Sequence, residues 1–128
     1  MGLNPSTADE VDSDPTITRC VHYARRWGYG GLLMTNIFAL RSTDPKVLYR
    51  HPEPVGEEND AWLKSCAAMA EIIIAGWGVH GALHGRGQAV RYILPQAKLH
   101  ILKLTQARHP GHPLYLKADL RPMLWEGI

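Results

Sequence analysis

The sequence has few cysteines, a single phenylalanine and no long run of apolar residues. Two cysteines among 128 residues cannot build a disulfide scaffold, and Cys20 and Cys66 both fall in apolar helical patterns, where a thiol usually serves as a small buried side chain. The longest apolar runs, such as residues 72–75, are far shorter than the roughly 20 residues that a bilayer requires. The first residues also lack the basic and then apolar pattern of a signal peptide. We therefore expect a cytoplasmic protein without a membrane segment.

A strong excess of one charge is missing as well. Fourteen Lys and Arg residues against twelve Asp and Glu residues give a net charge of +2. This balance excludes a protein that binds nucleic acid through the charge of its whole surface, so any contact with nucleic acid is expected to be local. The length fits one globular domain over residues 1–128, large enough to form a core without disulfides or a structural metal.

Helical patterns alternate with short apolar segments along the chain. Asp14 followed by Pro15 is a typical helix start, and the run at residues 32–38 is typical of a strand covered on both faces. This alternation predicts right-handed βαβ units and a three-layer α/β/α domain with a short, mostly parallel sheet of about four strands. Residues 1–3 leave only a stub of the first strand, so we expect an N-terminal truncation or a missing first strand. The helices are expected at residues 15–27, 46–49, 62–70 and 89–94, the other strands at 32–38, 71–75 and 99–104, and the core around Ile17, Val21, Leu33, Ile37, Ile73 and Ile101.

Polar side chains gather where the predicted strands end, which is where α/β sheets bind their ligands. The loop after the stub holds Asn4, Pro5, Ser6 and Thr7, and Pro5 restricts the backbone so that the Asn4 amide is held in place. Such a loop is able to hold a water or a polar ligand. Asx-turn and helix-capping chemistry explains the same residues without a ligand, and both interpretations stay open at this point.

Asn36 lies inside an apolar strand, where an unpaired amide costs about 1–3 kcal/mol and therefore needs partners. Its side chain either holds the neighbouring loop or reads the edge of a base-like ligand, because an amide offers a donor and an acceptor together. Arg41 follows at the mouth of the expected cleft, where it either contacts a phosphate or stays solvated.

The third junction is rich in glycine and histidine. Gly76, Trp77 and Gly78 stand between a predicted strand and a helix, where glycines let the backbone approach a ligand closely. The spacing is neither a Walker loop nor a dinucleotide fingerprint, so no cofactor is predicted. His80 and His84 are one helical turn apart, as in some metal sites, but no glutamate joins them and we predict no metal.

Two His-Pro pairs, His109-Pro110 and His112-Pro113, follow the last predicted strand. Each proline restricts the histidine before it to extended conformations, which makes the loop rigid. A histidine held in this way is able to stabilise a developing anion or to touch a phosphate. A rigid turn with solvated imidazoles is the alternative.

Two resemblances cover these loops. Short motifs resemble the uracil-DNA glycosylase superfamily: Gly2-Leu3-Asn4-Pro5, Thr35-Asn36, Ile74-Ala75-Gly76-Trp77-Gly78 and His109-Pro110-Gly111-His112-Pro113. Longer motifs resemble an uncharacterised bacterial and phage domain family, and this resemblance takes in nearly the whole chain. These motifs are Leu3-Asn4-Pro5-Ser6-Thr7-Ala8-Asp9, Asn36-Ile37-Phe38-Ala39 and His112-Pro113-Leu114-Tyr115-Leu116. That second family brings no established activity, so a function is implied by the glycosylase resemblance alone.

The glycosylase resemblance implies a uracil-DNA glycosylase-like fold and a role for each matching residue. Asn4 would position a water, in place of the aspartate of the most active branch, and Asn36 would read the base. His109 or His112 would stabilise the leaving base. Leu114 or Tyr115 would lie near the DNA minor groove, and further substrate contacts are expected from Pro5, Ser6, Thr7, Arg41, Gly76, Trp77 and Gly78.

Three functions follow as hypotheses. The first is hydrolysis of the N-glycosidic bond of an altered base that is captured outside the DNA stack. The second is a module that binds a nucleotide or nucleic acid without hydrolysis, and the third is an enzyme acting on a free nucleotide. Fold analogy does not separate them, because the site decides the function.

Overall fold

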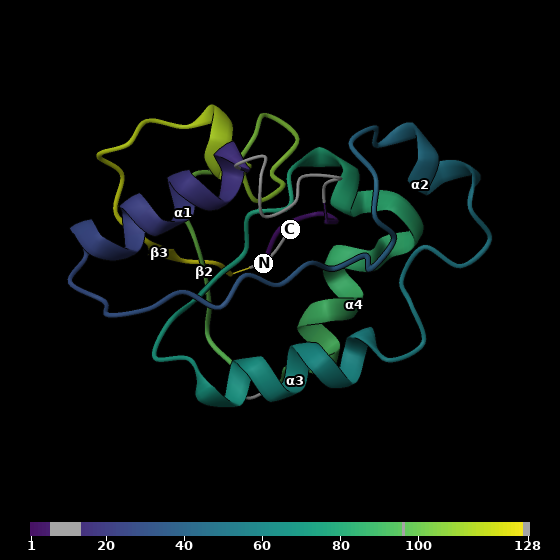
Figure 1. Ribbon diagram of the computed structural model, residues 1–128, viewed down its shortest axis with the longest axis horizontal. Helices are drawn as coiled ribbons and strands as arrows, with labels where there is room; N and C mark the ends of the chain where they lie inside the picture. The colour runs from purple at the N-terminus through teal and green to yellow at the C-terminus, as the bar shows by residue number, and fades with distance from the viewer. Residues whose placement is uncertain (6–13, 96, 127–128) are drawn as a thin grey trace.

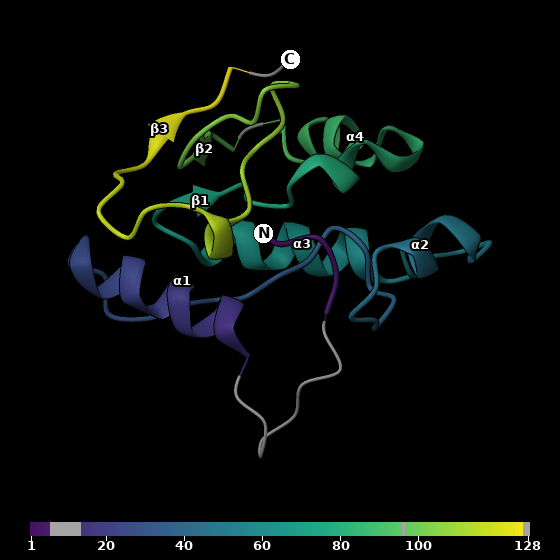
Figure 2. The same ribbon diagram turned by 90° about the horizontal axis from the view of Figure 1, so that it is seen from above.

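The computed structural model describes residues 1–5, 14–95 and 97–126 and shows a mixed α/β arrangement (Figure 1). Helices α1 and α4 lie on opposite sides of the strands (Figure 2). None of the helices in the described ranges is long and apolar enough to cross a membrane. The elements are α1 (Pro15–Arg26), α2 (Lys46–Arg50), α3 (Asn59–Met69), β1 (Ile73–Ile74), η1 (Val79–Gly85), α4 (Arg86–Ile93), β2 (Leu99–Ile101), η2 (Pro113–Tyr115) and β3 (Met123–Leu124), where η marks a 3-10 helix.

The three strands form a small mixed sheet in the order β1-β2-β3, with β1 parallel to β2 and β2 antiparallel to β3. Backbone hydrogen bonds continue the parallel arrangement past β1. The amine of Met1 donates to the carbonyl of Ile74 (2.6 Å), and Gly2 bonds to Thr35 (2.7 Å) and Ile37 (3.0 Å) on its other side. The first residues of the chain therefore lie between β1 and the segment around Thr35. Because these pairings are parallel, the carboxyl ends of β1, β2, residues 1–3 and the segment around Thr35 lie at one edge of the sheet.

Helix α1 begins and ends where the sequence predicts. The Asp14 carboxylate caps it by accepting from the backbone N–H groups of Thr16 (2.8 Å) and Ile17 (3.4 Å), and Pro15 occupies the first turn. Its inner face carries Tyr23, whose ring stacks on Trp27. The Tyr23 hydroxyl donates to the carbonyl of Lys117 and the Trp27 indole donates to that of Leu120 (3.1 Å), so α1 is tied to the chain that follows η2.

The predicted core is only partly correct. Ile37 and Ile101 are buried, but Ile17 is 42% exposed and Leu33 is 50% exposed. Val21 and Ile73 are half-buried. Residues 1–3 pair only with the segment that begins at Thr35. Residues 32–33 are therefore exposed, because no strand of the described ranges lies beside residues 32–33. The observed core contains Leu3, Ile37, Phe38, Leu48, Leu63, Trp77, Val90, Leu99, Ile101 and Trp125.

Candidate functional site

Residues from several of the predicted loops lie side by side at the carboxyl edge of the parallel strands. Asn36 pairs with Gly2 across the two neighbouring segments, and a Cβ on Gly2 would lie 2.8 Å from Asn36 Oδ1. Next to them, a Cβ on Gly76 would lie 3.0 Å from Pro113 Cδ, so the chain after β2 covers the end of β1. Gly2 and Gly76 thus form the floor between Asn36 and the second His-Pro pair.

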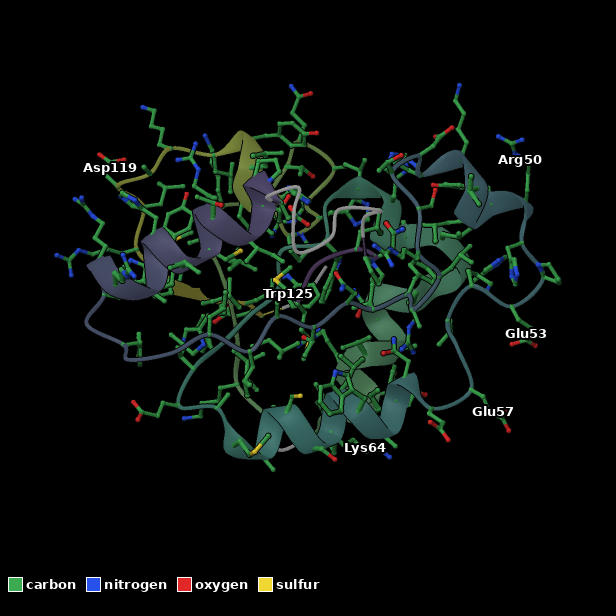
Figure 3. All side chains as sticks on the ribbon, in the orientation of Figure 1. Arg50, Glu53, Glu57, Lys64, Asp119 and Trp125 are labelled. Atoms are coloured by element: carbon green, nitrogen blue, oxygen red, sulfur yellow. The ribbon has the colours of Figure 1, made fainter. Side chains whose placement is uncertain are left out.

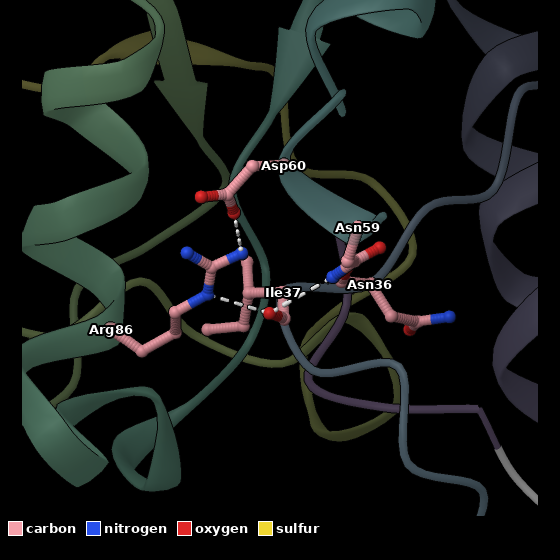
Figure 4. Close-up of polar contacts among 5 residues, drawn as sticks. All are labelled: Asn36, Ile37, Asn59, Asp60 and Arg86. Atoms are coloured by element: carbon pink, nitrogen blue, oxygen red, sulfur yellow. Dashed lines mark hydrogen bonds and ion pairs between the residues drawn. The ribbon is translucent and has the colours of Figure 1, made fainter. Parts of the chain in front are cut away.

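Asn36 uses its main chain and its side chain in different ways. Its carbonyl accepts a hydrogen bond from Asn59 Nδ2 (2.9 Å). Its half-buried side-chain amide has no hydrogen-bond partner within the described ranges, and it points away from Arg86 and Asp60 (Figure 4). Within the described ranges the amide therefore holds no loop, and it is available there to a ligand that offers both a donor and an acceptor.

Asn4 holds a loop. Its Nδ2 donates to the carbonyls of Leu40 (2.9 Å) and Ser42 (3.0 Å), while Ser42 donates its backbone N–H to the carbonyl of Pro5 (2.9 Å). These acceptors fix which way the amide faces, so Oδ1 is turned away from the loop. The amino group of Asn4 thus has a structural role, although not the Asx-turn or helix-capping role expected from the sequence, and its oxygen has no hydrogen-bond partner within the described ranges. Arg41 lies exposed on the same loop, and Ser6 and Thr7 lie outside the described residues.

His112 is fixed in orientation and in tautomer. It precedes η2, and its Nδ1 accepts from the backbone N–H of Leu114 (3.2 Å), which places the proton of the neutral ring on Nε2. Burial lowers the pKa of His112 below its ordinary value, and the Asp14 carboxylate opposes this in part. The ring lies 5.3 Å from that of Tyr115, which is exposed, and a Cβ on Gly78 would lie 3.6 Å from its Cβ.

His109 belongs to a different turn. Thr105 accepts its backbone N–H through Oγ1 (3.1 Å) and donates to its carbonyl (2.8 Å), which closes a tight turn around Arg108. Pro110 then pairs with Leu104 in an isolated antiparallel bridge. Of the two histidines predicted to act on a leaving base, His112 is therefore the one placed over Gly78.

The glycine-rich junction does not form a ligand cradle. Gly76 donates its N–H to the carbonyl of Met1 (2.9 Å) and Gly78 donates to that of Pro110 (2.9 Å), so neither N–H is open to an anion. The Trp77 side chain was predicted to contact substrate, but it is 2% exposed and packs edge-on against Trp125 at 5.5 Å. The large indole takes the buried position because the glycines around it make room.

The metal alternative also lacks its geometry. The backbone leaves the helical region at Leu83 and His84, so His80 and His84 do not share one helix face. Nδ1 of His80 instead lies 3.0 Å from the hydroxyl of Tyr49. No group of three metal-ligating side chains occurs in the part of the chain that the structure describes.

A cavity of about 440 Å³ adjoins the floor of the site on the α1 side. It runs from Gly2 and Gly76 between α1 and α3, and its walls are mostly apolar. Both free cysteines line it, and burial raises the pKa of the Cys20 thiol, as expected for an inert side chain in apolar surroundings.

A polar network that sequence reasoning missed lies behind Asn36 (Figure 4). Asn59 Nδ2 donates to the carbonyls of Asn36 (2.9 Å) and Ile37 (3.1 Å). Arg86 Nε donates to the same Ile37 carbonyl (2.7 Å), and its Nη2 forms an ion pair with Asp60 (2.6 Å). No signal in the sequence indicates this network, because an arginine between Gly85 and Gly87 does not by itself indicate a buried cation.

Comparison with known proteins identifies the chain by family. No curated protein and no solved structure matches it. One family, described as "Protein of unknown function (DUF1643)", matches residues 1–114. The matched range contains Asn4, Asn36, His112 and the Asn59–Arg86 network. Because the match spans most of the 128 residues, the chain belongs to this family of proteins of unknown function.

Proposed function

We propose that the carboxyl edge of the sheet binds a nucleobase, and that the protein hydrolyses the N-glycosidic bond of an altered base in DNA. The observation that carries the proposal is the Asn36 amide, which has no partner within the described ranges and stands on the same edge as His112. Short motifs similar to those of uracil-DNA glycosylases support the same reading.

The spacing of the site suits a base. Asn36 and Gly76 flank Gly2 on adjacent segments, and two strand spacings amount to roughly 10 Å. Because Asn36 and Pro113 cover the two glycines, a flat ring would lie beyond them, with one edge at the Asn36 amide and the other toward the His112 side of the site. In DNA the base must leave the helix stack to enter such a site.

The reaction assigns one task to each side chain. A water held by Asn4 Oδ1 attacks C1′, and the electrons of the breaking C–N bond leave with the base. His112 donates its Nε2–H to the negative charge on the departing base, and the proton of the water passes to solvent. A preorganised donor of this kind contributes most where charge develops.

A binding module without hydrolysis is the second candidate, and Asn4 is the observation that favours it. An amide cannot take a proton from water, and the amino group of Asn4 is committed to Leu40 and Ser42. In that case the same site retains a nucleotide without cleaving it.

Cleavage assays distinguish the candidates. We would incubate the protein with single-stranded and duplex oligonucleotides that carry uracil, a thymine mismatch or an alkylated base, and detect abasic sites by alkaline cleavage. Equilibrium binding of the same strands would be measured in parallel, with Asn36→Ala as the test variant and Tyr92→Ala, which alters an exposed ring on α4, as the control. Cleavage or binding that Asn36→Ala lowers supports the proposal. Absence of both, or binding that Asn36→Ala leaves unchanged, overturns it.

A further inference from the structure

We infer that Asn59 and Arg86 are positioning residues for base recognition, because they fix the main chain from which the Asn36 amide projects. The inference rests on the proposed function. It assigns a role in binding to a network that lies behind the site.

The segment at Asn36 is anchored from two sides. On one side Gly2 pairs with it through backbone hydrogen bonds. On the other side, where no strand of the described ranges continues the sheet, Asn59 and Arg86 donate to its carbonyls. Side chains from α3 and α4 thus take the place of a neighbouring strand.

The donors hold two successive peptides, the Asn36–Ile37 peptide through the Asn36 carbonyl and the Ile37–Phe38 peptide through the Ile37 carbonyl. Asn59 Nδ2 bonds to both carbonyls, and the planar fork of Arg86 reaches Ile37 with Nε and Asp60 with Nη2. Arg86 is 5% exposed, and a buried guanidinium is retained only where it is paired and hydrogen-bonded. The bond to the Asn36 carbonyl restrains the peptide attached to Asn36, and the bonds to the Ile37 carbonyl restrain the next one, so together they restrain the direction of the Asn36 Cα–Cβ bond.

A double-mutant cycle separates this role from general support of the fold. We would measure the affinity for a uracil-containing single strand in the wild type, Asn59→Ala, Asn36→Ala and the double variant. If Asn59 acts through Asn36, Asn59→Ala lowers affinity roughly threefold to tenfold, the weight of one net hydrogen bond, and has no further effect once Asn36 is alanine. Arg86→Lys, which keeps the charge but loses the fork, is expected to behave in the same way.

Two controls exclude a trivial loss of folding. Leu63→Ala removes a buried side chain from the same helix without touching Asn36, so it lowers stability while leaving affinity of the folded protein unchanged. A strand whose uracil is methylated at N3 lacks the donor that an amide reads, so its weaker binding should not respond to Asn59→Ala. If Asn59→Ala unfolds the protein, Arg86→Lys, which keeps a charge beside Asp60 but loses the Nε donor to the Ile37 carbonyl, replaces it in the cycle.

The outcomes are distinct. An Asn59 effect that vanishes in the Asn36→Ala background supports the inference. An equal effect in both backgrounds, or an equal loss in Leu63→Ala, overturns it and leaves the proposed function intact. Wild-type affinity in Asn36→Ala overturns the proposed function and the inference together.

Discussion

His112 shows how much of the proposed chemistry depends on the surroundings of a single side chain. Its Nδ1 is occupied by the backbone N–H of Leu114, so Nε2 is the only nitrogen that can donate to a ligand. Burial favours the neutral ring, which is the form that donates at Nε2 while leaving Nδ1 as an acceptor. The His109 ring has no such hydrogen bond within the described ranges, where only its main chain is held, by Thr105.

Replacing His112 by asparagine tests the donor without removing the cap. An asparagine oxygen can still accept from the Leu114 N–H, but the Nε2–H is lost. We expect His112→Asn to lower hydrolysis roughly 10²- to 10³-fold, the scale seen when one preorganised donor is removed. His109→Asn in the preceding turn is the matched control. The measurement is the single-turnover cleavage rate of each variant. A larger loss of rate in His109→Asn than in His112→Asn would assign the donor role to His109.

The lowered pKa of His112 gives a second prediction, on pH. The pKa of His112 in the folded protein lies below 6.5, so at pH values between the folded and the unfolded pKa the unfolded chain binds more protons than the folded one. The stability that the neutral ring contributes is therefore fully present above pH 6.5. It is lost as the pH falls through the lower, folded value. Urea unfolding at a series of pH values should therefore show a decline in the free energy of unfolding below pH 6.5 that is smaller in His112→Asn. Equal declines in the two proteins would contradict this.

The elements of the fold differ in how well the sequence predicts them. Helix α1 follows from Asp14, Pro15 and an apolar stripe, because caps and helical spacing are local signals. The strand at residues 32–38 was predicted too long. Only the part from Thr35 onward pairs with residues 1–3, and this pairing depends on contacts that are distant in the sequence. The same limit explains why Asn4 and Asn36 were placed on one edge from strand order alone, while the Asn59 and Arg86 contacts behind them were not foreseen.

The cap of α1 is coupled to the site. Asp14 stabilises the first turn of the helix and also raises the pKa of His112 against the effect of burial. We expect Asp14→Ala to lower the free energy of unfolding by about 1 kcal/mol and to shift the His112 titration to lower pH. Thermal unfolding and proton NMR of the imidazole measure the two effects. Thr18→Ala, one turn further into the helix, is the control and should leave the titration unchanged.

At the scale of the whole molecule, Trp77 explains a pattern that looks functional in the sequence. The glycines between residues 76 and 87 indicated a loop that approaches a ligand. In the structure the indole of Trp77 fills the space that side chains at Gly81 and Gly87 would need, and it joins β1 to α4 and to Trp125. Packing and ligand contact both favour glycine, so composition alone could not separate them.

Adding one methyl group tests this assignment. A Cβ at Gly81 would overlap Cδ1 of Trp77, whose buried ring packs against Trp125 near the middle of the molecule (Figure 3). Because a buried ring has little room to move, we expect Gly81→Ala to cost roughly 1–3 kcal/mol through overpacking. Gly31→Ala is the matched control, because a Cβ there meets no atom within 4 Å. It should leave stability unchanged or raise it slightly by restricting the unfolded chain. Chemical denaturation followed by tryptophan fluorescence compares the two. If Gly81→Ala unfolds at the same denaturant concentration as the wild type, the glycines do not serve the packing of the core. The loop would then again be a candidate for ligand contact.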